Sequence, residues 1–225
     1  MALRGKGMLV VFSEVKARHE RDFNEWYNRE HIDERVNMPG FRRARRYVAV
    51  NGSPKYLATY ECSKVGDLAT PAYLAVLADQ TPWTQATMAR FTRFNRYAFN
   101  IRVDLTHGIG GALTTVRFAP DAARRRDLIA WLRDTALPGF VKRPGMLGAS
   151  AGEDDLETAN APAKQNSKGY KPVEQAEWIV MLEGADPKAT EAATRALFKP
   201  TALRRFGVAQ PATIGTYRLL FGFDR

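Results

Sequence analysis

The sequence FNEWYNREHIDERVNMPGF, residues 23–41, contains a helix and the point at which that helix must end. Apolar residues recur at the helical period from about residue 19 to residue 36, and Pro39-Gly40 then stops the helix and starts a strand over 41–50. The flanking patterns add a strand at 8–12, a turn at 51–54, a strand at 56–61, a helix at 67–78 and a long strand at 91–103. This part of the chain therefore has the order β-α-β-β-α-β.

The same order recurs in the remainder of the chain. Leu137-Pro138-Gly139-Phe140 resembles Met38-Pro39-Gly40-Phe41 and lies 99 residues later. Around it we expect strands at 112–118, 146–150, 178–182 and 213–223 and helices at 121–136 and 190–198. We therefore predict two ferredoxin-like halves, 1–106 and 107–225, that pack sheet to sheet as an α+β barrel within one chain. A polar connection at 153–175 interrupts the second half, and it is either a flexible insertion or an ordered lid.

Composition limits the class of protein. The chain has 225 residues, 45% of them hydrophobic and 26% charged, which suits one broad domain or two small ones. Its 34 basic and 24 acidic residues give a net charge of +10, which favours an anionic partner: nucleic acid, a membrane surface or a small acidic substrate. Much of the excess falls at 42–46, 90–102 and 124–126, and we expect most of it on the solvated outside of the barrel.

Cellular location is constrained only by what the sequence lacks. The apolar run at 8–12 is too short for a secretory signal, and no segment approaches the ~20 residues of a membrane span. Cys62 is the one cysteine, cannot form an intramolecular disulfide, and is expected to be a buried thiol. We therefore expect a cytoplasmic protein that does not enter membranes.

The first helix places titratable groups on its apolar face. At about 100° per residue, Tyr27, Glu30, His31 and Glu34 lie on the same side as the aromatic residues. Polar groups at the centre of a packing face must be hydrogen-bonded or must line a cavity. We predict His31 as a general acid or base, Glu34 as the group that orients it and Tyr27 as a donor to a developing oxyanion. The alternative is a histidine at a helix end within a surface salt-bridge cluster.

These residues resemble a known family. The pattern Trp26-Tyr27-x-x-Glu30-His31-x-x-Glu34-Arg35, followed by Pro39-Gly40-Phe41 and an arginine-rich strand, is similar to the EthD-like branch of the dimeric α+β barrel superfamily. The resemblance is specific over about residues 12–61 and otherwise rests on topology. It implies a pocket between helices and sheet in each half, a histidine at the position of His31 as the acid or base, and relatives that include cofactor-free monooxygenases, lactone isomerases, polyketide cyclases and haem-binding enzymes.

The second half lacks the polar set. With the two Pro-Gly-Phe corners aligned, His31 corresponds to Ala130 and Glu30 to Ile129, so we expect one ligand-binding half and one degenerate, structural half. A planar, acidic ligand would need aromatic surfaces and cations near His31. The residues predicted to bind such a substrate are Trp26, Glu30, Arg35, Arg43, Arg45, Tyr47, Tyr60 and Trp83.

Cofactors and other partners follow from the same counts. Three histidines and one cysteine offer no metal-binding spacing, so no metal is predicted, while haem, which needs a single axial histidine, stays possible. The order β-α-β-β-α-β also occurs in RNA-recognition domains, but their Gly-aromatic signature is missing, so nucleic acid is an unlikely partner. A homodimer is possible.

The function that these observations predict is proton-transfer chemistry on a planar aromatic or polyketide-like metabolite. An isomerase, cyclase or lyase step in the metabolism of aromatic compounds would fit, with His31 as its acid or base. The alternatives are a non-catalytic ligand-binding or assembly protein of the same fold, and a haem-binding or cofactor-free monooxygenase.

Overall fold

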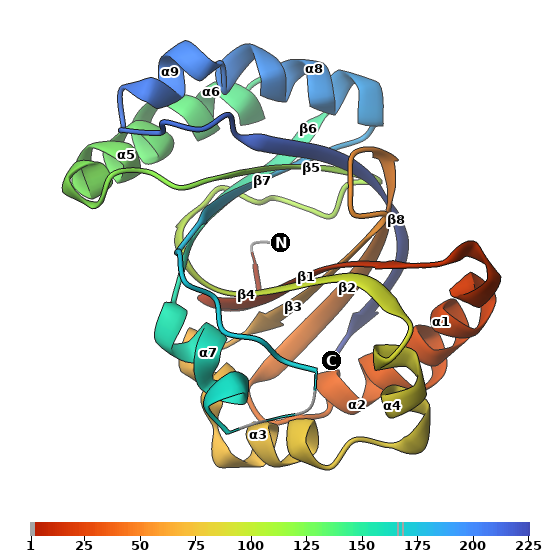
Figure 1. The fold of residues 1–225 in the computed structure, drawn as a ribbon. Coiled ribbons are helices and arrows are strands. Elements are labelled where there is room, and N and C mark those ends of the chain that lie inside the picture. The colour runs from red at the N-terminus through yellow and green to blue at the C-terminus, as the bar shows by residue number, and fades with distance from the viewer. Residues whose placement is uncertain (1–2, 166, 168) are drawn as a thin grey trace.

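Eight antiparallel strands close into a barrel in the computed structural model, which describes residues 3–165, 167 and 169–225 (Figure 1). Around the barrel the strands follow the order β1-β3-β2-β8-β5-β7-β6-β4. The strands of the first half are β1 (Gly7–Val15), β2 (Phe41–Asn51), β3 (Tyr56–Cys62) and β4 (Phe91–Asp104). Those of the second half are β5 (Ala112–Phe118), β6 (Met146–Asp154), β7 (Trp178–Gly184) and β8 (Thr213–Asp224). Each half contributes a four-stranded sheet, and pairing of β2 with β8 and of β4 with β6 closes the barrel. The α+β class with two halves in one chain is confirmed.

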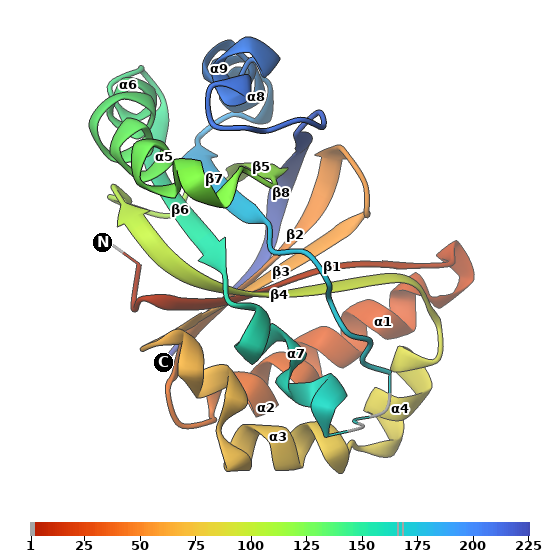
Figure 2. The same ribbon diagram turned by 60° about the vertical axis from the view of Figure 1, so that its left-hand side comes forward.

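Helices cover the outside of the barrel in two layers (Figures 1 and 2). Over the first half lie η1 (Ala17–His19), α1 (Glu20–Trp26), η2 (Tyr27–His31), α2 (Ile32–Val36), η3 (Val65–Ala69), α3 (Pro71–Ala78) and α4 (Pro82–Met88). Over the second lie η4 (Ala122–Arg124), α5 (Arg125–Trp131), η5 (Leu132–Ala136), α6 (Leu137–Val141), α8 (Pro187–Leu197) and α9 (Pro200–Arg204). No helix among the described residues is long and apolar enough to cross a membrane.

Alternation along the strands divides each sheet between two cores. On β1, Met8, Val10 and Phe12 point into the barrel, whereas Leu9 and Val11 contact the helices outside. The inner core gathers apolar residues from both halves, and each helical layer has a core of its own. Cys62 is fully buried in the outer core of the first half, as expected. A site between helices and sheet in one half is therefore separated from the barrel interior by the sheet itself.

The two halves repeat with an offset different from the predicted one. Pro144-Gly145, not Pro138-Gly139, occupies the corner that corresponds to Pro39-Gly40, so the repeat is 105 residues, not 99. Gly40 and Gly145 both have positive φ, at 91° and 77°, a conformation that favours glycine. Pro138 lies instead inside α6, directly after a π-helical turn where the backbone hydrogen-bond ladder changes register.

The predicted connection at 153–175 contains an ordered helix. Residues of β6 continue to Asp154, and α7 (Leu156–Lys164) follows with Asp155 as its N-cap. Although α7 belongs to the second half in sequence, it lies among the helices of the first half, beside α3 (Figure 2). Helix α4, which Thr81 caps and Pro82 begins, was also missed by the sequence analysis. The second half thus supplies part of the cover over the first.

Candidate active site

A small cavity lies between the first helical layer and the outer face of its sheet. Its volume is about 20 Å³, which is room for about one water molecule. The side chains that line it come from β1, β3, β4, the first helix, α3, α4 and the connection after α7. They are Leu9, Val11, Trp26, Tyr27, His31, Arg35, Tyr60, Tyr73, Met88, Phe91, Phe94, Arg96 and Tyr170.

A π-helical turn brings His31 to this cavity. Residues Tyr27–His31 form η2, which adds one residue to the helix and shifts the phase of its buried face. After the turn it is Ile32, Arg35 and Val36 that are buried, while Glu34 lies at the edge. A regular helix would bury Glu34 more fully and turn Arg35 away. The π turn therefore exchanges a carboxylate for a guanidinium in the cavity wall.

Aromatic rings hold the His31 imidazole from three sides. It stacks on Trp26 with ring centroids 4.2 Å apart, and it meets Tyr27 at 5.2 Å and Tyr60 at 6.2 Å edge to face. Trp26 is fixed in turn, because its Nε1 donates to the Thr84 hydroxyl of α4 at 3.0 Å. The orientation of the imidazole is thus set by packing.

The charge state of His31 follows from its burial. Desolvation lowers the pKa of His31 well below its usual 6.5, and the nearby guanidinium groups of Arg35 and Arg46 lower it further. Its Nδ1 has no hydrogen-bond partner among the described residues, and the closest carboxylate oxygen, Oε2 of Glu34, is 4.0 Å away. This distance is too long for a hydrogen bond. At neutral pH His31 is an uncharged imidazole with a free ring nitrogen.

Two phenols accompany the imidazole. Burial raises the pKa of Tyr27, and it raises that of Tyr60 well above its usual value of 10, so both remain protonated at neutral pH. The Tyr60 hydroxyl has no hydrogen-bond partner among the described residues. Arg46 lies 4.1 Å from the centre of the Tyr27 ring and is held in place by the side-chain oxygens of Asn24 and Asn28. The cavity wall therefore offers hydroxyl donors beside a neutral base.

Only some of the predicted site residues lie together. Trp26, Tyr27, His31, Arg35 and Tyr60 line the cavity, and Glu34 lies at its margin, in an ion pair of 3.2 Å with Arg35. Burial raises the pKa of Glu34 from its usual value.

Glu30 and Trp83 lie away from the cavity lining. Glu30 accepts hydrogen bonds from the hydroxyls of Thr81 and Thr84 at 2.6 and 3.1 Å, and it thereby ties the first helix to α4. The indole of Trp83 donates to Asp22 at 3.2 Å.

Arg43, Arg45 and Tyr47 face the barrel interior, on the other side of the sheet from His31. Arg43 forms a bidentate pair with Glu61 at 2.8 and 2.9 Å, and Arg45 bridges Glu61 and Glu183 at 3.3 and 2.8 Å. These arginines are 2% exposed, so the expectation that this strand carries solvated charge is wrong except for Arg42. Their role is to neutralise two buried glutamates. Because the sheet separates them from His31, they do not line its cavity.

Five aromatic or cationic residues of the cavity were not predicted: Tyr73, Phe91, Phe94, Arg96 and Tyr170. Strand alternation could have identified Arg96, because it shares a face of β4 with Phe94 and Ala98, both of which contact the helices. The interleaved pattern at 90–102 instead suggested exposed charge. Tyr170 had no signal, since its position depends on where the connection after α7 crosses the first half.

The corresponding place in the second half is filled. The offset of 105 residues aligns the π turn η2 with η5, His31 with Ala136 and Arg35 with Phe140. Ala136 and Phe140 are both buried in an apolar core. The second half therefore lacks counterparts of His31 and Arg35 with the offset of 105 residues, as it lacked a counterpart of His31 with the predicted offset of 99.

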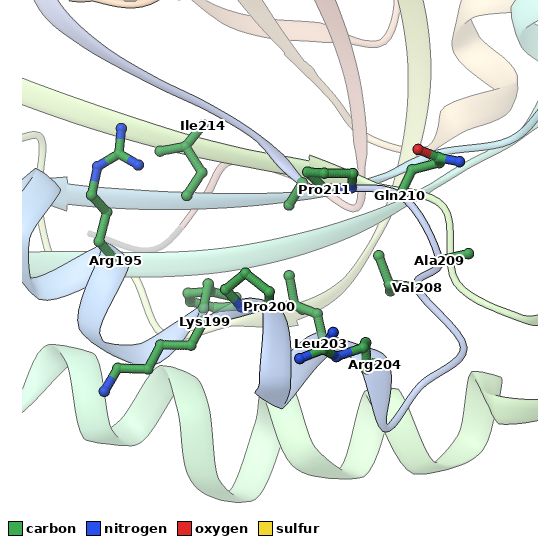
Figure 3. Close-up of a pocket in the computed structure, with 12 residues that line it drawn as sticks. Arg195, Lys199, Pro200, Leu203, Arg204, Val208, Ala209, Gln210, Pro211 and Ile214 are labelled. Atoms are coloured by element: carbon green, nitrogen blue, oxygen red, sulfur yellow. The ribbon is translucent and has the colours of Figure 1, made fainter.

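A larger groove of about 340 Å³ opens elsewhere in the second half, between α8, α9 and the residues before β8 (Figure 3). Its lining includes Arg195, Lys199 and Arg204. No histidine, carboxylate or tyrosine lines it among the described residues, so it offers no acid or base of near-neutral pKa.

The cavity does not fit a macrocycle. A volume of about 20 Å³ at His31, whose ring is covered by Trp26, cannot hold haem. Among the residues that the structure describes, no three histidine, cysteine, aspartate or glutamate side chains cluster as metal ligands would.

Comparison with known proteins defines the fold class. No protein-family model matches the sequence, and no curated protein matches it. Among solved structures, an anthrone oxidase-like protein superposes with a TM-score of 0.68 at 13% identity, over 100% of this chain and 95% of that one. A protein provisionally named a monooxygenase, from Fusobacterium nucleatum subsp. nucleatum ATCC 25586, superposes with a TM-score of 0.58 at 9% identity, over 99% of this chain and 96% of that one. A variant of chlorite dismutase from Candidatus Nitrospira defluvii superposes with a TM-score of 0.54 at 10% identity, over 95% of this chain and 92% of that one.

Identities this low establish the fold alone. The chain has the fold of the dimeric α+β barrel, ferredoxin-like proteins, with both halves in one polypeptide. Membership of the EthD-like branch stays a prediction from the sequence.

Proposed function

We propose that this protein is an enzyme that removes a proton from an activated carbon of a small planar molecule, with His31 as the general base. The observation that carries the proposal is the neutral, buried imidazole with a free Nδ1 beside two protonated phenols. A neutral imidazole accepts a proton, and phenols that stay protonated can donate to the oxygen on which negative charge develops. This combination suits the enolisation of a ketone.

The proton balance of the step is simple. The substrate C–H bond breaks, its proton moves to Nδ1 of His31, and the electron pair delocalises onto the carbonyl oxygen next to the hydroxyl of Tyr27 or Tyr60. The imidazolium that forms lies 4.0 Å from the Glu34 carboxylate, which stabilises it without a hydrogen bond in the resting state. Return of the proton to another carbon completes an isomerisation, and attack of the carbanion within the substrate completes a cyclisation.

A second outcome of the same deprotonation is reaction of the carbanion with molecular oxygen. The similarity of fold to an anthrone oxidase-like protein and to proteins named as monooxygenases supports this alternative. It needs the same base and adds O₂ as the co-reactant. The two candidates therefore share their first step and differ in what consumes the enolate.

Anthrone, a planar ketone with acidic C–H bonds, serves as the probe. Because the cavity at His31 has a volume of only about 20 Å³, the proposal requires the side chains that it shares with the adjoining groove of about 440 Å³ to move when anthrone binds. We expect the protein, in the absence of oxygen, to accelerate the exchange of the methylene protons of anthrone with deuterium from D₂O. Proton NMR measures the rate of this exchange. His31→Gln should lower this rate by about 10²-fold or more, with an unchanged circular dichroism spectrum. His19→Gln is the matched control, because His19 lies on the same helical segment, outside the cavity.

The outcomes separate the candidate functions. Oxygen uptake in air by the wild type, lost in His31→Gln, favours the oxygenase, whereas exchange without oxygen uptake favours an isomerase or cyclase. Wild-type rates in His31→Gln would refute the proposal. Binding of anthrone with no exchange would indicate the non-catalytic ligand-binding protein.

A further inference from the structure

Two buried guanidinium groups converge on the His31 cavity, and only one of them has an ion pair among the described residues. Arg35 is 2% exposed and Arg96 7%, and both line the cavity. They lie over the same ring, 5.8 and 6.0 Å from the centre of Tyr73. Arg35 has one partner, Glu34, at 3.2 Å. Among the described residues, Arg96 forms no ion pair within 4.0 Å; the buried Asp154, whose pKa Arg96 lowers, acts on it only from a longer distance.

The hydrogen bonds of Arg96 are also incomplete. Its Nη1 donates to the main-chain oxygen of Ala159 in α7 at 3.0 Å, but its Nε and Nη2 are buried without an acceptor among the residues described. Burying an arginine whose charge and donors are unpaired is costly, and a nearby aromatic ring offsets only part of that cost. Two adjacent free N–H groups of one guanidinium form the planar fork that binds a carboxylate through both oxygens.

Arg96 lies at the junction of two spaces. A groove of about 440 Å³ runs beside the His31 cavity, under the residues that follow α7, and its volume suits a small organic ligand. Cavity and groove share the same dividing wall. The wall consists of Met88, Phe91, Phe94, Arg96 and Tyr170. Four of these five side chains are apolar or aromatic, so Arg96 is the one charged group of the wall itself, while Arg93 and Lys171 line other parts of the groove.

We propose that Arg96, supported by Arg35, binds the carboxylate of an aromatic acid that enters from the groove, and that the shared wall moves so that the ring occupies the space formed by joining groove and cavity. The proposal rests on the proposed function in that it names the substrate class of the same site, but binding can be measured without turnover. The aromatic wall residues contact the ring, and the carboxylate supplies the acceptors that Nε and Nη2 lack. Arg43 and Arg45, which the sequence suggested for this role, already have carboxylate partners inside the barrel.

Benzoate is the probe, and benzamide is its uncharged counterpart of the same shape. Thermal unfolding of the full chain is followed at increasing concentrations of each, with sodium chloride holding the ionic strength constant. A ligand that binds only the folded state raises the melting temperature. We expect benzoate to bind about tenfold or more tightly than benzamide, as a charged, bidentate contact predicts.

The matched variants are Arg96→Gln and Arg102→Gln. Glutamine at position 96 is polar but carries no charge, so the preference for benzoate should vanish. Arg102 is exposed on the same strand and lines neither the cavity nor the groove, so its replacement should leave the preference unchanged. Should Arg96→Gln fail to fold, Arg96→Lys, which keeps the charge but loses the fork, should show a reduced preference.

Failure of this inference differs from failure of the proposed function. Equal stabilisation by benzoate and benzamide in the wild type, or a full preference retained in Arg96→Gln, would overturn the carboxylate site. In His31→Gln the preference for benzoate should persist even though proton exchange is lost. A preserved benzoate preference together with wild-type exchange in His31→Gln would instead refute the role of His31 and leave the carboxylate site standing.

Discussion

Asp154 is a buried carboxylate at the start of the connection that covers the His31 cavity, and its replacement by asparagine tests how that connection is held. The side chain is 6% exposed, and burial raises its pKa from 3.8 to about 7. One oxygen accepts from the Ala98 amide at 3.0 Å, and the other has no partner among the described residues. Glu177 and Asp155 raise this pKa, whereas Arg96 lowers it.

The sign of the pH effect follows from linkage. Because the folded protein holds this proton more tightly than the unfolded chain does, Asp154 contributes stability at low pH, and that contribution is lost as the pH rises from about 4 through 7. For pKa values of 3.8 and about 7, the loss between pH 5 and pH 8 is about 2.7 kcal/mol. Asparagine keeps an acceptor for the Ala98 amide and does not titrate.

Urea unfolding of the wild type and of Asp154→Asn at several pH values between 5 and 8 gives the difference in unfolding free energy at each pH. We expect this difference to shift in favour of the variant by about 2–3 kcal/mol across that range. Taking the difference removes the contribution of His31, whose lowered pKa acts in the opposite direction. Asp186→Asn, at the N-cap of α8, is the control, because asparagine caps a helix as well as aspartate does. A difference that does not vary with pH would refute the reasoning.

Three further substitutions test the packing around the site. Gly40→Ala places a Cβ 2.5 Å from the carboxyl carbon of Asp67, whereas the Cβ of Gly145→Ala has no atom within 4 Å. We expect Gly40→Ala to lower the free energy of unfolding by at least about 2 kcal/mol more than Gly145→Ala does. Equal losses in urea unfolding would contradict this expectation. Arg45→Met leaves two glutamates short of a partner and should destabilise by about 3–5 kcal/mol, while the exchange activity of the folded fraction, measured at low temperature, stays unchanged; lost activity would place Arg45 in the site. Glu30→Ala removes two hydrogen bonds from hydroxyl groups and should lower the free energy of unfolding in urea by about 1–3 kcal/mol. An unchanged free energy of unfolding would mean that these hydrogen bonds do not stabilise the helix that carries His31.

The architecture was accessible from the sequence because each half repeats one simple pattern. Strand alternation and helical periodicity determine β-α-β-β-α-β twice, and four-stranded sheets with one bare face each leave few ways to pack. The offset between the halves was not accessible in the same way. Two Pro-Gly pairs, at 138 and 144, compete for the corner, and only the π turn before Pro138 explains why the helix continues through the first of them.

The site was predicted in part for the same reason. Tyr27 begins the π turn, so its place on the apolar face did not depend on the turn. His31 ends the turn, which brings its ring onto Trp26. Arg35 and Glu34 follow the turn, and the extra residue exchanges their positions relative to a regular helix. Neither helix-wheel reasoning nor composition can detect such a turn, because it depends on hydrogen bonds between residues five apart.

The net charge of the chain did not predict where its arginines lie in the fold. A strand with four arginines in five positions suggests a solvated basic surface, yet three of them are buried. Arg43 and Arg45 satisfy glutamates that come from other strands, and Arg46 lies against Tyr27 and two asparagines. The partners of Arg45 are separated from it by 16 and 138 residues along the chain. Long-range pairs of this kind have no local signal in the sequence.

The length of one hairpin connection explains why the two halves differ in access. Strand β6 pairs with β4, so its end at Asp154 lies beside the outer face of the first half, and the connection from 155 to 177 is long enough to extend over that face. The corresponding connection of the first half, 52–55, is a short turn. Its Pro54 carbonyl accepts from the Tyr217 hydroxyl of the second half at 3.4 Å, and Asn51, which precedes the turn, donates to Glu191. This turn is too short to extend over the second helical layer, whereas the long connection places Tyr170 in the wall of the His31 cavity. Residues of the second half, which has no counterpart of His31, therefore contribute to the burial that keeps His31 neutral.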